Sequence, residues 1–250
     1  MSDYEQKLED FYSRILRPGD IAIDVGAHSG RHTLPMMTSV GAEGAIFAFE
    51  PIPHIRRTLE QRIAGHQHAS IVHSHSCALA DAPGEAVFEV VNEFPEYSGL
   101  RERRYDGNVT RTQIQVVIDT LDRVLPVDIG VRFIKVDCEG AELLVLRGGE
   151  ETLRRCRPYI AIESGDGSLL HYPYDAGDIH DFLARRGYSV FNLAGKRHSR
   201  EEFVNANSVQ AYWDYIAVPN EFVDEYATVV TQSISCTTSS ATGAASGCST

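Results

Sequence analysis

Short apolar runs alternate with stretches of helical periodicity along most of this chain. The apolar runs, which predict strands, are Ile21–Val25, Ala45–Phe49, a weaker Ser70–His75, Phe133–Val136 and Tyr159–Ile162. The stretches between them that predict helices are Arg31–Val40, Pro53–Ala64 and Ala141–Cys156. Strands that are apolar on both faces suit a parallel sheet covered by helices. The alternation therefore predicts a doubly wound, mostly parallel α/β sheet with helices on both faces.

An irregular segment interrupts this alternation once, and a further helix and two strands follow near the end of the domain. Two predicted strands, Glu85–Val91 and Gln113–Ile118, have no helix between them, so residues 92–112 form an irregular insertion. Long loops in compact domains are often functional. The closing elements are a predicted helix at Asp178–Arg186 and an antiparallel pair of strands at Tyr188–Leu193 and Val209–Val218.

Composition and charge limit what the chain can do. Its 250 residues are 43% apolar, enough for one large domain, and its formal charge is −12. That charge argues against a protein that coats nucleic acid or an anionic membrane, because such binding needs a clustered basic surface. The first residues are polar, without an apolar leader, and no run approaches the ~18 apolar residues of a membrane span. The five cysteines are scattered without a CxxC pair, which favours a reducing cytoplasm over disulfides or a zinc site.

Three regions are expected along the chain. Residues 1–19 form a helical segment, and residues 20–220 form one α/β domain that contains the insertion. Residues 231–250 are almost all Ser, Thr, Ala and Gly and carry no charge. Such a segment cannot bury enough apolar surface to offset its ordering entropy, so we expect a disordered tail.

The first candidate site follows the first predicted strand, in the run from Asp24 to Gly30 (DVGAHSG). Ligands of open α/β sheets bind beyond the carboxyl ends of strands, and Gly26 and Gly30 permit a tight turn and a close backbone approach. His28 stands where a dinucleotide fingerprint needs glycine. The pattern instead suits a nucleoside that carries a cation and a carboxylate, with backbone N–H groups binding the carboxylate. A plain tight turn without a ligand is the alternative.

The second candidate is Glu50, which directly follows the second predicted strand. An acidic residue at this point grips a ribose diol, because a carboxylate accepts two hydroxyl hydrogen bonds. A solvated carboxylate at a strand end is the alternative. The combination of Glu50 with the glycine turn favours a nucleoside site.

The third candidate is the run of carboxylates Asp137, Glu139 and Glu142 after the strand Phe133–Val136. Acidic side chains in a first helical turn are favoured by the helix dipole, and we expect that capping role for Glu142. Asp137 lies at the strand end and faces the crevice. Closely spaced carboxylates raise one another's pKa, which suits a general base or a substrate clamp. Oxygen ligands also suit Mg²⁺, but no histidine pattern with metal-ligand spacing supports a metal site.

These motifs occur in an order that resembles the FkbM-type methyltransferases. The matching segments are IAIDVGAHSGRHT, AIFAFEPIPHIRRTLEQ, CALADAPGEAVF, TLDRV, FIKVDCEGAELLVLRGGEETLRRCRPYIAIE and HDFLARRGYSVFNL, within Asp20 to Leu193. The run VDCEGAELLVLRGG is the most specific of them. The resemblance implies a Rossmann-like class I fold with a seven-stranded sheet and one antiparallel edge strand. It also implies an S-adenosylmethionine-dependent enzyme, most often an O-methyltransferase acting on hydroxyls of sugars or secondary metabolites.

The resemblance also implies roles for individual residues. The cofactor's methionine end would be lined by Asp24, Gly26, Ala27, His28 and Gly30. The ribose would be bound by Glu50, and the adenine would be flanked by Cys77 and Ala78. The catalytic residues beside the transferred methyl would be Asp137 and Glu139, and the substrate-binding residues would be Ser98, Arg103 and Glu163. His28 and Cys77 depart from the family, which more often has a small amide residue and an asparagine there.

Other functions stay open on the sequence alone. The same scaffold supports N- or C-methylation, because the cofactor half says little about the acceptor. A degenerate member would bind S-adenosylmethionine without catalysis. The expected partner is a small hydroxylated acceptor, with no nucleic acid and no membrane.

Overall fold

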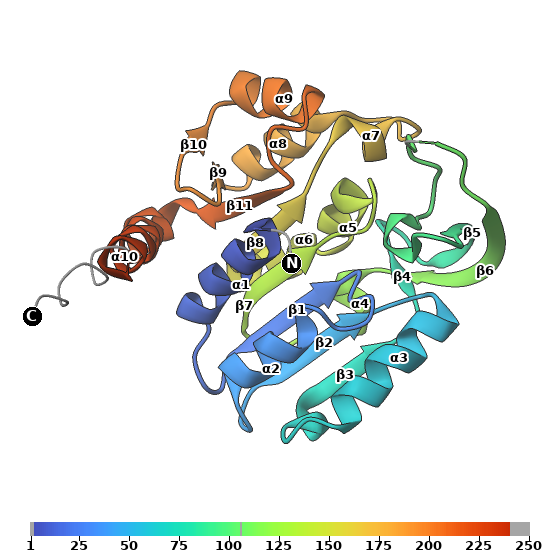
Figure 1. The fold of residues 1–250 in the computed structure, drawn as a ribbon, viewed down its shortest axis with the longest axis horizontal. Helices are drawn as coiled ribbons and strands as arrows, with labels where there is room; N and C mark the ends of the chain where they lie inside the picture. Colours follow the sequence, from blue (N-terminus) through green and yellow to red (C-terminus); the bar gives the residue numbers. More distant parts are fainter. Residues whose placement is uncertain (1–2, 106, 241–250) are drawn as a thin grey trace, which may run out of the picture.

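The computed structural model describes residues 3–105 and 107–240, and a central sheet with helices on both faces dominates it (Figure 1). Eight strands form this sheet in the order β10-β9-β11-β8-β7-β1-β2-β3. Their bounds are β1 Ile21–Val25, β2 Ala45–Phe49, β3 Val72–His75, β7 Val131–Val136, β8 Tyr159–Glu163, β9 Tyr188–Asn192, β10 Arg197–His198 and β11 Asp214–Pro219. The predicted doubly wound, mostly parallel sheet is therefore confirmed, with the two-residue strand β10 as an eighth member.

The antiparallel strand β11 lies inside the sheet, between β8 and β9. The predicted antiparallel pairing of the last two long strands is correct. The predicted antiparallel edge strand is also present, and it is the short β10. Residues 215–219 of β11 are buried, because helices cover both faces of the sheet where β11 runs.

Two groups of helices cover the faces of the sheet. Their bounds are α1 Asp3–Ile15, α2 Thr33–Val40, α3 Pro53–Ala64, α4 Leu121–Val124, α5 Glu142–Gly148, α6 Glu150–Cys156, α7 Asp166–Leu169, α8 Ala176–Arg185, α9 Arg200–Ser208 and α10 Val223–Ser240, with 3-10 turns η1 Ala69–Ile71, η2 Pro95–Tyr97 and η3 Asn220–Phe222. One face packs against α1, α2, α3 and α10, and the other against α5, α6, α8 and α9. Each group buries its own apolar cluster.

The helix expected at Ala141–Cys156 is two helices, α5 and α6, which meet at Gly149. A Cβ atom on Gly148 would lie 2.0 Å from the carbonyl oxygen of Ala80. The chain therefore approaches its neighbour so closely that only glycine fits, and the glycine pair is where the helix breaks.

The two strands that flank the predicted insertion, residues 92–112, belong to a small sheet beside the central one. Its strands, in the order β4-β6-β5, are β4 Ala78–Leu79, β5 Gly84–Val91 and β6 Arg111–Asp119. Strands β5 and β6 pair antiparallel along their length, and the segment between them folds back so that Gly99 bridges Glu89. This return places residues 95–100 against the carboxyl ends of the main strands.

Helix α10 extends through Ser240, so residues 231–240 are helical where disorder was expected. The rest of the expected tail, 241–250, lies outside the described residues. None of the described helices combines the length and apolar character that crossing a bilayer requires.

Candidate active site

Two adjoining cavities open where the parallel strands β1, β2, β7 and β8 end. The first, the glycine-turn pocket, is lined by Val25, Gly26, His28, Phe49, Glu50, Pro51, Ile52, Cys77, Ala78, Leu79, Phe88, Pro95, Glu96, Ser98, Leu100, Asp137, Cys138, Glu139 and Ala141. The second, the acidic cavity, encloses about 370 Å³ and is lined by Tyr4, Glu5, His32, Glu96, Tyr97, Lys135, Asp137, Glu139, Glu163, Trp213 and Asp214. Three residues line both cavities, and they are Glu96, Asp137 and Glu139.

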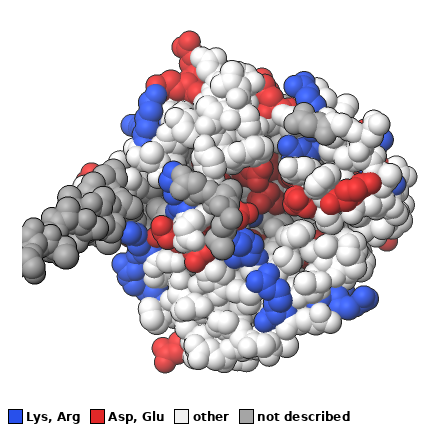
Figure 2. Space-filling model, viewed as in Figure 1, with Lys and Arg blue, Asp and Glu red and all other residues white. Residues whose placement is uncertain are grey.

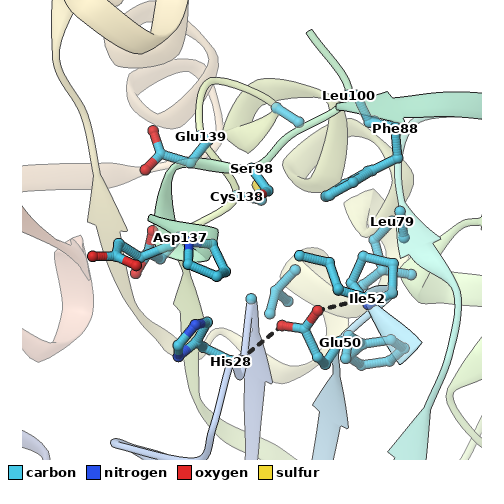
Figure 3. Close-up of a pocket in the computed structure, with 18 of the residues that line it drawn as sticks. His28, Glu50, Ile52, Leu79, Phe88, Ser98, Leu100, Asp137, Cys138 and Glu139 are labelled. Carbon is cyan, nitrogen blue, oxygen red and sulfur yellow. Dashed lines mark hydrogen bonds between the residues drawn. The ribbon is translucent and has the colours of Figure 1, made fainter. Parts of the chain in front are cut away.

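The glycine turn after β1 is set by a close backbone contact with β7. Gly26 has a φ of +77°, and a Cβ atom there would lie 1.8 Å from the carbonyl oxygen of Asp137. Only glycine fits this approach. His28 also has a positive φ, of 47°, and its backbone N–H points at the Glu50 carboxylate (Figure 3). The turn and the end of β2 therefore form one unit.

Glu50 is fixed by two backbone hydrogen bonds. Its Oε1 accepts from the Ile52 N–H at 2.7 Å and its Oε2 accepts from the His28 N–H at 3.0 Å (Figure 3). The residue is 4% exposed, and burial raises the pKa of its carboxyl to about 7. Each oxygen keeps a lone pair for a further donor, which is what a ribose diol requires.

The structure separates the predicted cofactor residues into two groups. Those that line the glycine-turn pocket are Gly26, His28, Glu50, Cys77 and Ala78. The remaining three, Asp24, Ala27 and Gly30, do not line it.

The three residues that do not line the pocket pack against the core and against α2 and α3, and in this way they position the turn. Asp24 is 1% exposed, and its Oδ2 accepts from the Thr33 hydroxyl at 2.6 Å at the start of α2. Ala27 packs in the core, and a Cβ on Gly30 would lie 2.8 Å from the Leu59 side chain. They hold the loop in place.

The small sheet and the insertion together supply an apolar wall that the sequence did not identify. Leu79, Phe88 and Leu100 face Glu50 across the pocket (Figure 3). An apolar wall opposite a diol-binding carboxylate matches a flat purine joined to a ribose. No sequence motif marks Phe88 for this place, because it arrives on a hairpin outside the main sheet.

Asp137 is held ionised by a buried lysine. Lys135 is 4% exposed, and its Nζ donates to Asp137 Oδ2 at 2.7 Å. Burial favours the neutral acid, but the charge of Lys135 outweighs it and lowers the pKa of Asp137. The expectation that neighbouring carboxylates raise this pKa is therefore wrong for Asp137, because a cation lies closer.

Burial, together with the neighbouring carboxylates Asp137 and Glu142, raises the pKa of Glu139, as the sequence predicts for closely spaced carboxylates. Burial raises the pKa of Glu139 to about 8 although Arg103, its ion-pair partner, opposes the rise. The Arg103 guanidinium in turn lies 4.5 Å from the centre of the Tyr97 ring. Arg103 lines neither cavity, but it contacts two residues of the acidic cavity, Glu139 and Tyr97.

Glu142 lies in the first turn of α5, and its carboxylate bonds to the turn that precedes this helix. Its Oε1 accepts from the N–H groups of Cys138 and Gly140, each at 3.1 Å. It is 1% exposed and lines neither cavity. Its bonds shape the turn that presents Asp137 and Glu139.

Of the predicted acceptor residues, Glu163 lines the acidic cavity but Ser98 does not. Ser98 lines the glycine-turn pocket, and its hydroxyl accepts from the Val91 N–H at 2.9 Å. Carboxylate oxygens of Asp137, Glu139 and Glu163 lie within 4.8 Å of one another. Strand ends far apart in the chain thus contribute one acidic group.

Three further residues of the acidic cavity have no signal in the sequence. His32 directly precedes α2, Trp213 directly precedes β11, and Asp214 is the first residue of β11. They reach the cavity because β11 inserts beside β8, an arrangement that periodicity alone does not predict.

Comparison with known proteins agrees with this fold. A profile described as Methyltransferase FkbM domain matches residues 24–190. Among solved structures, the chain is similar to methyltransferase FkbM from Methylobacillus flagellatus KT, with 16% identity and a TM-score of 0.50 over 87% of this chain and 55% of that one. The chain thus spans little more than half the length of that protein. A search of curated proteins finds no significant match.

A second solved structure, a putative rRNA-methylase from Clostridium thermocellum, is similar over 87% of this chain and 94% of its own. Its identity to this chain is 10% and the TM-score is 0.51. At these identities, the likeness of both structures shows the shared fold alone.

Proposed function

This chain belongs to the FkbM methyltransferase family, and on that premise we propose that it transfers a methyl group from S-adenosylmethionine to a hydroxyl oxygen of a sugar or secondary metabolite. One observation carries the proposal beyond the family. Asp137 and Glu139 line both cavities, so they lie where a donor in one would meet an acceptor in the other. A transfer reaction needs such a junction.

The glycine-turn pocket fits the donor. Glu50 offers two fixed oxygens to a ribose, and the apolar wall suits an adenine. Gly26 itself lines the pocket, where its backbone turns tightly against the Asp137 carbonyl. When bound, S-adenosylmethionine supplies an electrophilic methyl group.

The residues at the junction orient the acceptor and accept its proton. Asp137 stays ionised beside Lys135, so it can accept a hydrogen bond from a hydroxyl and align it. Glu139 has a pKa of about 8, close to the working range of a general base. Together they support a hydroxyl acceptor, whose proton must leave before or after transfer.

Product analysis tests the proposal. The protein is incubated with S-adenosylmethionine carrying a ¹³C-labelled methyl group and a panel of hydroxylated sugars and secondary metabolites. We expect a product heavier by one labelled methyl group, with the carbon shift of a methoxy group in NMR. Label attached to nitrogen or carbon would contradict O-methylation, and no label transfer to any compound would contradict the proposed activity.

A further inference from the structure

We propose that Arg103 is a positioning residue for the transfer reaction, which holds the Glu139 carboxylate at the junction of the two cavities without touching the acceptor itself. This inference rests on the proposed function and goes beyond it, because it gives a role to a side chain that lines neither cavity. It replaces the role that the resemblance implies for Arg103, which is direct substrate binding.

Arg103 lies in a segment of the insertion, residues 99–104, that is fixed at both ends. At one end, a Cβ atom on Gly99 would lie 3.2 Å from the Cβ of Glu139, so the backbone lies against this residue. At the other end, the Arg104 N–H donates to the Gly167 carbonyl of α7 at 2.9 Å (Figure 1). The segment therefore brings Arg103 to Glu139 on an anchored backbone.

The Arg103 guanidinium makes a buried ion pair with Glu139. Its Nη1 donates to Glu139 Oε2 at 2.5 Å, and the two side chains are 11% and 5% exposed. The contact of the same guanidinium with the Tyr97 ring restricts where it can turn. The ion pair uses one carboxylate oxygen, and a carboxylate has a second with which to accept a proton.

The backbone of Glu139 gives a separate reason to regard its position as enforced. Its φ is +54°, in the left-handed region that residues other than glycine, asparagine and aspartate rarely adopt. Such residues persist where the surrounding structure holds them, and they cluster at active sites. The ion pair with Arg103 is one contact that holds Glu139 in this conformation.

Arg103 also supplies positive charge where acidic groups are crowded. Figure 2 shows acidic side chains gathered in the hollow near the centre of the molecule. The carboxyl groups that act on Glu139 or share its cavities are Asp137 after β7, Glu142 in α5, Glu163 in β8 and Glu96 in η2. Of the cations beside them, Lys135 pairs with Asp137, and Arg103 pairs with Glu139.

The charge of Arg103 decides whether Glu139 is able to accept a proton. Burial raises the pKa of Glu139 to about 8, and Arg103 opposes that rise. Without Arg103, the pKa would be higher, and the carboxyl would stay protonated near neutral pH. In the transfer, the acceptor oxygen bonds to the methyl carbon, the sulfur keeps the electrons of the broken S–C bond, and the acceptor's proton passes to Glu139. Arg103 stays protonated throughout and acts through Glu139.

The first test needs no acceptor. In the full chain labelled with ¹³C at the glutamate carboxyl carbons, NMR follows the titration of Glu139, and the signal is assigned by its loss in Glu139→Gln. We expect Arg103→Gln to raise the Glu139 pKa by about one unit, the scale of a lost neighbouring charge. Arg103→Lys, which keeps the charge, should raise it less. Arg104→Gln, an exposed arginine of the same segment, is the matched control and should leave it unchanged.

The second test is the pH dependence of methyl transfer. The compound of the hydroxylated panel that is methylated fastest serves as acceptor, and kcat and KM are measured from pH 6 to 9.5. We expect the wild-type kcat to rise as Glu139 ionises. Arg103→Gln should lower kcat by ~10-fold at pH 7.5 but by less than about 3-fold at pH 9.5, with KM nearly unchanged, because one pKa unit is a tenfold change in the ionised fraction.

A double-mutant cycle shows whether Arg103 acts through Glu139. In a Glu139→Gln background there is no carboxylate to hold, so adding Arg103→Gln should lower kcat at pH 7.5 by less than about 2-fold. The same ~10-fold loss in both backgrounds would show that Arg103 acts elsewhere and would overturn the inference.

Three further results would also overturn it. A raised KM with an unchanged pH profile would show that Arg103 binds the acceptor. A kcat lowered equally at every pH would show that Arg103 only supports the fold of the insertion. An unchanged Glu139 titration in Arg103→Gln would show that the ion pair does not control this carboxyl. If no compound of the panel is methylated, the proposed function fails, while the NMR titration still decides whether Arg103 controls Glu139.

Discussion

Asp137 and Lys135 form the pair on which the proposed chemistry most depends. Asp137→Asn keeps the shape of the side chain but removes the charge that aligns the acceptor hydroxyl. We predict near-normal affinity for S-adenosylmethionine and a turnover lowered by roughly 10²-fold or more. Steady-state turnover and calorimetric affinity on the same preparation measure both effects. The matched control is Asp181→Asn, which changes a surface carboxylate paired with Arg200.

Two results would contradict this role of Asp137. Turnover near the wild-type rate would show that the residue only shapes the turn before α5. Equal losses of turnover and cofactor affinity would show that it supports the glycine-turn pocket instead, through the contact of its carbonyl with Gly26.

Glu50 makes stability depend on pH in a definite direction. Its pKa is raised to about 7 in the folded chain, so between about 4.5 and 7 the folded state holds a proton that the unfolded state has lost. This contribution to stability therefore falls as pH rises through that window. We predict that Glu50→Gln, which cannot ionise, gains on the order of 1–2 kcal/mol relative to the wild type between pH 5.5 and pH 8. Denaturant unfolding of both proteins at the two pH values checks it, and an unchanged difference would show that Glu50 is already ionised at pH 5.5.

The part of the site that could be predicted from the sequence consists of residues that directly follow predicted strands. Gly26, Glu50 and Asp137 directly follow apolar runs, and parallel strands bring their carboxyl ends to one edge. His32 and Asp214 give no such signal. A histidine at a helix start and an aspartate at a strand start are ordinary, and only the fold brings them together.

At the scale of elements, the break between α5 and α6 depends on the close approach at Gly148. Gly148→Ala places a Cβ 2.0 Å from the Ala80 carbonyl oxygen, so the backbone must shift. We predict a loss of ~1–3 kcal/mol in the free energy of unfolding. Gly84→Ala is the control, because nothing lies within 4 Å of its added Cβ. Equal stability of the two variants would mean that α5 and β4 do not approach as described.

Helix α10 holds to the sheet through its first turns. Tyr226 is 1% exposed, donates to the Asn192 carbonyl at 3.0 Å and packs against Phe11 and Phe191. We predict that Tyr226→Ala costs ~3 kcal/mol of stability. Truncation after Val230 should change the melting temperature by less than about 2 °C, since the buried contacts described for α10 end with Val229 and Val230. A large loss on truncation would show that the end of the chain also contributes.

At the scale of the whole molecule, the hydrophobic periodicity predicts that helices cover a sheet, but it does not predict which strands are adjacent in that sheet. Apolar runs and the helices between them predict the doubly wound sheet, because parallel strands of one sheet are joined by right-handed crossovers through helices. The pairing of β11 with β8 joins strands distant in sequence, and no local pattern encodes it. The same holds for the hairpin of β5 and β6, which closes the glycine-turn pocket from outside the main sheet. The cofactor half of the site was therefore more predictable than the acceptor half.

The central claim is that the glycine-turn pocket binds S-adenosylmethionine through Glu50. The most direct measurement is a calorimetric titration of the full chain and of Glu50→Ala with S-adenosylmethionine. The account predicts one binding site per chain, weakened by ~1.5–3 kcal/mol in Glu50→Ala because a doubly hydrogen-bonded carboxylate is lost. No binding to the wild-type chain, or the same affinity in Glu50→Ala, would contradict it.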